Sequence, residues 1–145
     1  MEYKNKIKLT FPSKSENESF ARNAVACFLL NLNPTVEEIS DVKTAVSEAV
    51  TNSIVHGYPN YVGEIVLEAE IINDHIHINV FDQGVGIENV KNALEPFYTT
   101  KPLDERSGIG FSVMQSFMDD VIVESEKGKG TKVYMKKKFQ PTFKE

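Results

Sequence analysis

The stretch Ser47-Glu48-Ala49-Val50-Thr51-Asn52-Ser53-Ile54-Val55-His56-Gly57 decides the fold of this chain. It continues a stripe of apolar and small residues at helical spacing, made of Val42, Ala45, Val46, Ala49, Val50 and Ser53. Such a stripe predicts a helix that packs against a core. Glu48, Asn52 and His56 follow at intervals of four along one edge of the stripe, and Gly57 is placed to end the helix in a left-handed cap. We therefore expect a carboxylate and a carboxamide to project side by side into a partly dry space, where something polar binds.

The composition predicts one compact domain, because 145 residues with ordinary apolar and charged fractions support a single core. We expect this domain to span residues 1–139 and residues 140–145 to form a disordered tail. No run approaches the length of a membrane span and no signal peptide precedes the domain, so we expect a cytoplasmic protein without membrane contact. The formal net charge of −5 argues against direct nucleic-acid binding. The lone Cys27 lies on an apolar helix face and is interpreted as a core residue.

A strand and a helix are expected at the N-terminal end. Residues 6–11 alternate polar and apolar and stop at Pro12, which predicts a strand near a sheet edge, open to a second subunit. Ser15 and Glu18 have the spacing of a capping box, as do Thr35 and Glu38 at the start of the next helix. The apolar positions of the first helix are Phe20, Ala21, Ala24, Val25, Phe28 and Leu32.

Arg22 lies away from these apolar positions of the first helix. It is either a solubilising charge or a contact with a partner.

The second half of the chain is expected to form strands around one further helix, which Gly108-Ile109-Gly110 opens. The expected strands are residues 65–72, 75–81, 121–125 and 131–136. The first two are joined at Asn73-Asp74 in a tight hairpin. His75 and His77 share one face of their strand, but a metal site would need a third ligand and none is evident nearby.

Several familiar nucleotide and hydrolase motifs are missing from the sequence. It contains no P-loop pattern, and Gly84-Val85-Gly86 lacks the third glycine of a dinucleotide or kinase loop. No G-x-S-x-G elbow occurs, so a serine hydrolase is not supported.

Four short motifs remain, and their order is specific. They are Glu48-x-x-x-Asn52, Asp82-x-Gly84-x-Gly86, Ser107-Gly108-x-Gly110 and Gly128-x-Gly130-Thr131. Together they resemble the ATP-binding domain shared by gyrase, Hsp90-type chaperones, sensor histidine kinases and MutL, known as the GHKL or Bergerat fold. This resemblance covers nearly the whole chain. It implies an α+β, two-layer α/β sandwich with helices on one face of a mixed, mainly antiparallel sheet, and ATP and Mg²⁺ as cofactors.

By this resemblance, one group of residues recognises the adenine base. Asp82 accepts from the 6-amino group, a bond that the carbonyl of guanine cannot offer. Gly84 and Gly86 let the backbone approach the base closely. Thr131 supports the same edge of the base, directly or through water.

A second group would hold the metal and the phosphates. Asn52 offers an amide oxygen to Mg²⁺, and Gly108 and Gly110 present backbone N–H groups at a helix N-terminus. The segment from Lys91 to Ser107 resembles the ATP lid of the family. Its candidate phosphate contacts are Thr99, Thr100, Lys101 and Ser107. Arg106 is either a clamp on the γ-phosphate or an exposed lid charge that a partner contacts.

Glu48 matches the catalytic carboxylate of the family, one turn before Asn52. As general base it would orient or deprotonate a nucleophile in line with the γ-phosphate. The alternative is a surface carboxylate paired with Lys43 or Lys91, and the presence of the other motifs favours catalysis.

Within this fold, the chain resembles the short bacterial anti-sigma factors that are also serine kinases. The resemblance rests on Ser15–Arg22, Ser47–Asn52, His56–Tyr58, Thr99–Pro102 and Glu105–Gly108. It implies a homodimer that binds a sporulation sigma factor of the sigma-F type when ATP is bound, and that phosphorylates a serine of a STAS-type anti-anti-sigma protein. Arg22 matches a partner-binding position. Two alternatives stay open: a nucleotide-gated anti-sigma protein without useful kinase activity, and a relative that serves a general-stress sigma factor.

Overall fold

The structure, a computed structural model, describes residues 2–87 and 106–140, with the side chains of residues 106–109 left out. The elements are β1 (Lys4–Pro12), α1 (Glu16–Leu29), η1 (Leu30–Leu32), α2 (Val36–Asn52), η2 (Ser53–Gly57), β2 (Glu64–Ile72), β3 (His75–Asp82), α4 (Arg106–Phe117), β4 (Asp120–Glu126) and β5 (Gly130–Lys138). The predicted tail falls almost wholly outside the described residues.

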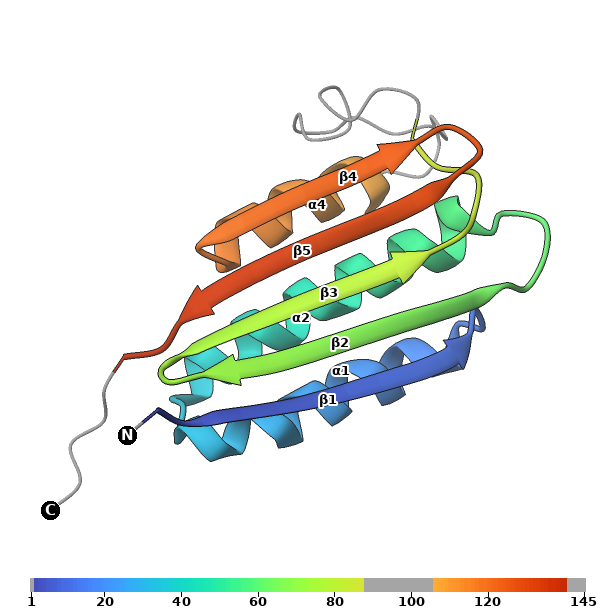
Figure 1. Ribbon diagram of the computed structural model, residues 1–145. Helices are drawn as coiled ribbons and strands as arrows, with labels where there is room; N and C mark the ends of the chain where they lie inside the picture. Colours follow the sequence, from blue (N-terminus) through green and yellow to red (C-terminus); the bar gives the residue numbers. More distant parts are fainter. Residues whose placement is uncertain (1, 88–105, 141–145) are drawn as a thin grey trace, which may run out of the picture.

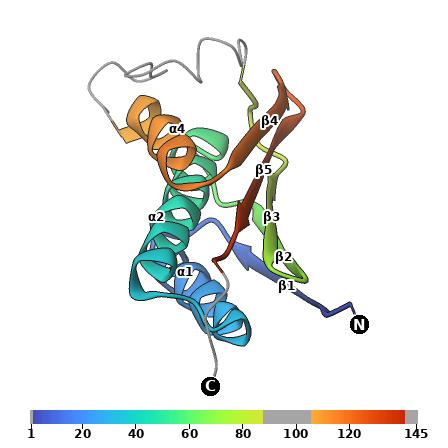
Figure 2. The ribbon, with the colours of Figure 1, turned by 90° about the vertical axis from the view of Figure 1, so that its left-hand side faces the viewer.

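The strands form one sheet, in the order β1-β2-β3-β5-β4. Helices α1, α2 and α4 lie side by side on one face of it, so the described chain has two layers (Figures 1 and 2). This confirms the predicted α+β sandwich. All four pairings between the described strands are antiparallel. A mixed sheet would contain at least one parallel pair, and none occurs among these described strands.

The core lies between the helices and the sheet, and α2 runs through its middle. Each apolar member of the predicted α2 stripe is 0% exposed, and Ser53 is 4% exposed. On the opposing side, β2 and β3 alternate buried with half-buried residues, as strands with one face on a core do. The periodicity of the sequence therefore identified the central helix and its buried face correctly.

Helix α1 departs from its predicted pattern, because it lies at the edge of the helix layer and has α2 as its main neighbour among the described helices. Its buried residues are Ala21, Val25, Phe28 and Leu29. Phe20 is 59% exposed and Cys27 is also exposed, so the prediction that both belong to the core was wrong.

One of the two predicted capping boxes forms. The Thr35 hydroxyl accepts from the Glu38 N–H at 3.0 Å, and the Glu38 carboxylate accepts from the Thr35 N–H at 2.9 Å. Ser15 makes no side-chain cap, because its backbone is already helical at φ −58° and ψ −33°, whereas Thr35 has the extended backbone that a capping side chain needs. The prediction for Ser15 was therefore wrong.

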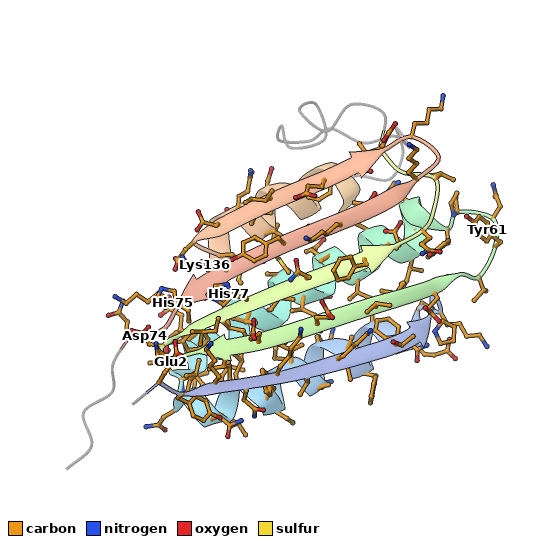
Figure 3. The ribbon with its side chains drawn as sticks, viewed as in Figure 1. Glu2, Tyr61, Asp74, His75, His77 and Lys136 are labelled. Atoms are coloured by element: carbon orange, nitrogen blue, oxygen red, sulfur yellow. The ribbon has the colours of Figure 1, made fainter. Side chains whose placement is uncertain are left out.

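The outer face of the sheet carries a polar row across all five strands. Its members are Lys6, Glu70, His77, Lys136 and Asp120, each the register partner of the next. Figure 3 shows His75, His77 and Lys136 at the end of the sheet away from Tyr61. His75 pairs with Asp74 at 2.8 Å, and His77 Nδ1 lies 2.7 Å from the Tyr134 hydroxyl. Among the described residues, no group of three or more His, Cys, Asp or Glu side chains is placed to hold a metal.

None of the described helices is both long and apolar enough to cross a membrane.

Candidate functional site

The inner face of the sheet ends in a row that changes from apolar to polar. Phe11, Ile65, Asp82, Thr131 and Ser125 are consecutive register partners across the five strands. Residues directly opposite each other share one face of a sheet, so Asp82, Thr131 and Ser125 form a polar group beside the core. The sequence predicted Asp82 and Thr131 together, and the sheet brings them together.

The Asp82 carboxylate is buried, at 7% exposed, and two donors hold it. The Ser53 hydroxyl donates to Oδ2 at 2.8 Å, and the Gly84 N–H donates to Oδ1 at 3.0 Å. Burial raises the pKa of the Asp82 carboxyl above its ordinary value, while the Ser53 and Gly84 hydrogen bonds and the Thr131 backbone act in the opposite direction. The carboxylate is thus fixed in orientation, with lone pairs left to accept from a ligand.

Gly57 has a role other than the predicted left-handed cap. The α-helical part of the segment ends at Asn52, and Ser53–Gly57 form a π-helical turn in which Gly57 does not have a positive φ. A Cβ on Gly57 would lie 2.9 Å from Asp82 Cγ, and one on Gly84 would lie 1.9 Å from the Gly57 carbonyl oxygen. The cap prediction was therefore wrong, because both glycines serve the close approach of the helix end to the segment that follows β3.

That segment, residues 83–87, is held from two sides. From the helix side, the Gly57 carbonyl accepts from the Val85 N–H at 2.9 Å, and the Tyr58 hydroxyl accepts from the Gln83 N–H at 2.7 Å. From the β4–β5 side, the Val85 carbonyl accepts from the Gly128 N–H at 2.6 Å. Gly86 sits at φ +75°, where a side chain would be strained and its Cβ would lie 2.1 Å from the Glu126 carbonyl oxygen. A side chain at Gly84 or Gly86 would collide with nearby backbone, which explains both glycines of the predicted D-x-G-x-G motif.

A second polar group forms where α2 meets α4. A Cβ on Gly110 would lie 2.9 Å from Glu48 Oε2, 3.2 Å from Asn52 Nδ2 and 3.6 Å from Asn52 Oδ1. The Asn52 Nδ2 atom is buried and has no hydrogen-bond partner among the described residues. Glu48 and Asn52 thus project side by side against bare backbone, as the sequence predicted.

The two polar groups adjoin each other at the end of α2. Asn52 faces Gly110, and the next residue, Ser53, donates to Asp82. The end of α2 therefore connects two groups of different chemistry. The buried Asp82 carboxylate is suited to recognising a base, and the Glu48 carboxylate with the Asn52 amide is suited to binding a hydrated cation. The Asn52 Nδ2, unpaired among the described residues, is a donor that a phosphate oxygen would fit, and the Glu48 carboxylate and Asn52 amide oxygen are of the kind that would hold Mg²⁺.

The remaining predicted residues are only partly described. Arg106, Ser107 and Gly108 make up the first turn of α4, where backbone N–H groups lack helical partners, and Gly110 is its fifth residue. The side chains of Arg106 and Ser107 lie outside the described part, as do Thr99, Thr100 and Lys101 entirely.

Arg22 lies on the opposite side of α2 from α4. Its guanidinium donates to both Glu18 carboxylate oxygens at 3.1 Å, and its side chain is 35% exposed. It forms one wall of a groove of about 440 Å³ between α1 and α2, whose other residues are Val36, Ile39, Ser40, Lys43, Thr44 and Ser47. Lys43 and Glu48 therefore serve different surfaces of α2.

Three residues of the site were not predicted. Ser53 was assigned only to the apolar stripe, and Tyr58 and Ser125 were given no role. Tyr58 bridges two loops, because its hydroxyl also donates to the Glu64 carbonyl at 2.7 Å. Ser125 could have been found by pairing the last two predicted strands, which places it directly opposite Thr131.

Comparison with known proteins agrees with the fold described above. The family described as "Histidine kinase-like ATPase domain" matches residues 11–137. The anti-sigma F factor of Clostridium acetobutylicum is 61% identical over 135 residues, covering 93% of this chain and 94% of that protein. The anti-sigma F factor of Clostridium beijerinckii is 60% identical over 136 residues, covering 93% and 95%.

Solved structures show the same fold. The RsbU and RsbW domains of Rv1364c from Mycobacterium tuberculosis match with a TM-score of 0.67 at 17% identity, over 94% of this chain and 33% of that chain. The histidine kinase domain of a blue-light activated kinase from Erythrobacter litoralis matches with a TM-score of 0.53 at 21% identity, over 72% and 46%. The family match and the sequence relatives show that the chain belongs to the histidine kinase-like ATPase domain family, among the anti-sigma F factors.

Proposed function

We propose that this protein is a cytoplasmic anti-sigma factor and a Mg²⁺/ATP-dependent protein-serine kinase. Its targets would be a sporulation sigma factor of the sigma-F type and a serine of a STAS-type anti-anti-sigma protein, and it would act as a homodimer formed by a single domain. The names of its relatives support the sigma-factor role. The observation that carries the proposal is the junction of two polar groups at the end of α2, with Asp82 on one side and Glu48 and Asn52 on the other.

The base-binding part of the site would use Asp82 and Thr131. Asp82 accepts hydrogen bonds and cannot donate while ionised, which suits the amino group of adenine. Gly57 leaves no side chain against the carboxylate, and Gly84 and Gly86 let the backbone after β3 pack closely beside it. Asn52 would offer its amide oxygen to Mg²⁺, and the first turn of α4 would face phosphate oxygens with its N–H groups.

The chemical part of the site would use Glu48. Bound ATP supplies the phosphoryl group, and Mg²⁺ neutralises its charge. Glu48 would accept the hydrogen of a partner's serine hydroxyl, orient its oxygen and take its proton. Gly110 lets α4 pack directly against the Glu48 and Asn52 side chains, which would help to fix their positions for this role.

The nucleotide part is tested by calorimetric titration of ATP and GTP, with and without Mg²⁺. We expect a magnesium-assisted preference for ATP, and loss of measurable ATP binding in Asp82→Asn, because the amide donates where the carboxylate only accepts. Equal affinity for the two nucleotides, or ATP binding that survives Asp82→Asn unchanged, would contradict the adenine site.

The kinase part is tested with γ-labelled ATP and a STAS-domain partner. Glu48→Gln should keep ATP affinity within about twofold and reduce label transfer by about 100-fold or more, as expected for a general base. Undiminished transfer would remove Glu48 from this role. Nucleotide-dependent binding of a sigma factor without any label transfer by the wild type would leave a nucleotide-gated binding module, and pull-down with sporulation and general-stress sigma factors would identify the target.

Arg22 is proposed to contact a partner from the groove between α1 and α2. Arg22→Glu should weaken partner binding while ATP affinity holds. Glu18→Gln is the matched control, because it breaks the same partly buried ion pair but keeps the arginine. If Arg22→Glu lowered ATP affinity as well, or if Glu18→Gln weakened the partner equally, Arg22 would have a structural role.

A further inference from the structure

Ser125 occupies the end of the polar row on the inner face of the sheet. It is the register partner of Thr131, which is in turn the register partner of Asp82. The Ser125 oxygen makes three contacts: it lies 2.7 Å from the Ile87 nitrogen, 2.8 Å from the Gly130 carbonyl oxygen and 2.7 Å from the Thr131 hydroxyl oxygen. A serine hydroxyl has one hydrogen and two lone pairs, so these contacts use its full capacity.

The direction of each bond follows from its partner. The Ile87 N–H can only donate, so it occupies one lone pair of the Ser125 oxygen. The Gly130 carbonyl can only accept, so it takes the single Ser125 hydrogen. The Thr131 hydroxyl must therefore donate to the second lone pair of Ser125. The reverse direction would leave the Ser125 and Gly130 oxygens 2.8 Å apart with no hydrogen between them, which is repulsive.

The consequence lies at Thr131. Because its hydrogen is committed to Ser125, the Thr131 hydroxyl presents only lone pairs to a ligand. Its neighbour Asp82 also presents only lone pairs, since its hydrogen bonds within the protein are all accepted. The edge of the site formed by these two residues is therefore acceptor-only.

We propose that Ser125 is a positioning residue that sets base specificity through Thr131. By holding the Thr131 hydrogen, it makes this part of the site complementary to the 6-amino group of a 6-aminopurine, which donates, and unfavourable to the 6-oxo group of a 6-oxopurine, which needs a donor. This inference rests on the proposed ATP site and adds a residue that does not touch the nucleotide.

The test compares ATP with inosine triphosphate, which carries an oxygen in place of the amino group. Ser125→Ala frees the Thr131 hydroxyl to rotate and donate to that oxygen. The dissociation constant for inosine triphosphate divided by that for ATP should therefore fall by about tenfold, the effect of one hydrogen bond. Ser125→Thr is the matched control, because it keeps a hydroxyl at this position and should restore the wild-type ratio. An unchanged ratio in Ser125→Ala, or no restoration in Ser125→Thr, would overturn the proposal.

A second pair of variants separates this role from a general structural one. In a Thr131→Val background, Ser125→Ala should change the ratio by less than about twofold, because the hydroxyl through which it acts is gone. A full tenfold change in that background would show that Ser125 acts by another route. Thermal unfolding without nucleotide, measured for each variant, reports stability separately from selectivity.

Thr131→Val alone keeps the proposal testable if Ser125→Ala does not fold. It removes the acceptor, so ATP affinity should fall more than affinity for inosine triphosphate; an unchanged ratio would overturn the proposal. The outcomes also separate the two claims. A wild-type protein that binds neither nucleotide removes the ATP site and this inference together, whereas a wild type that prefers ATP with an unaltered ratio in Ser125→Ala removes the inference alone.

Discussion

Gly110 of α4 lies directly against Glu48 of α2, so that a Cβ on the glycine would come within 2.9 Å of Glu48 Oε2. The same atom would lie 3.2 Å from Asn52 Nδ2. Both contacts are with the ends of side chains, which an alanine could displace. The helical backbone of α4 itself accepts alanine readily. The glycine is therefore a requirement of the site more than of the fold.

Gly110→Ala should separate binding from stability. We expect the free energy of unfolding to stay level or rise by up to about 1 kcal/mol, the helix propensity gained, while displaced Glu48 and Asn52 weaken Mg²⁺-ATP binding by about tenfold or more. Urea unfolding and calorimetric titration measure the two effects. Ser116→Ala, at an exposed position of the same helix, is the control that should leave binding unchanged. A Gly110→Ala protein with wild-type affinity would refute the idea that binding depends on the positions of Glu48 and Asn52 against α4.

Gly84→Ala should be among the more damaging glycine substitutions in the chain. Its Cβ would lie 1.9 Å from the Gly57 carbonyl oxygen and 2.4 Å from the Gly57 carbonyl carbon, and these backbone atoms cannot rotate away. We expect a loss of about 3 kcal/mol in the free energy of unfolding. Gly128→Ala is the comparison, because its φ of +83° is strained for alanine but nothing lies within 4 Å, so about 1 kcal/mol is expected. Equal losses in urea unfolding would mean that the close approach of residue 84 to the Gly57 backbone costs no more than the strained φ at Gly128.

Thr35→Ala should destabilise the protein by about 1 kcal/mol, because it removes the acceptor for the Glu38 N–H at the start of α2. Ser15→Ala, at the start of α1, should change stability by less than about 0.5 kcal/mol, since Ser15 makes no side-chain cap. Chemical unfolding of both variants gives the comparison. A similar loss from the two substitutions would show that the sequence pattern, and not the observed bond, determines the contribution.

His77 should make the fold less stable in mild acid. Burial lowers the pKa of this imidazole below its ordinary value of 6.5, and Lys136 and His75 act in the same direction, while Glu70 opposes them. The unfolded chain therefore binds the proton more readily, so the free energy of unfolding should fall as the pH drops from about 6.5 through the folded-state pKa. His77→Gln should lose this part of the pH dependence, and an NMR titration of the wild-type ring should give a value below 6.5. A pKa above 6.5 would mean that protonation of His77 stabilises the fold, which would contradict this prediction.

The sequence predicted most of the fold because the central elements are governed by local patterns. The α2 stripe is buried over its whole length, so its periodicity is unbroken, and β2 and β3 alternate as strands with one face on the core. Helix α1 was predicted less well because a helix at the edge of its layer buries a narrower stripe. Phe20 and Cys27 fit the spacing of a wider buried stripe, but both are exposed.

The errors at the site have a common physical cause. Ser125 acts through Thr131 across a strand pair, and Gly57 acts by its closeness to Asp82, so both depend on contacts between different elements and not on the spacing within one element. No local pattern carries that information. The predicted motif residues, by contrast, are concentrated at element ends, where the sequence marks them with glycines and a carboxylate.

The row that runs from Phe11 to Ser125 has a consequence for folding fidelity. Alternate residues of a strand point to opposite faces, so a slip of one position between β3 and β5 would turn Asp82 or Thr131 toward the solvent. A molecule with this register error would lose the proposed base-binding edge of Asp82 and Thr131 together with its correct hydrophobic contacts. Errors in assembly would then yield inert molecules and not regulators of altered specificity.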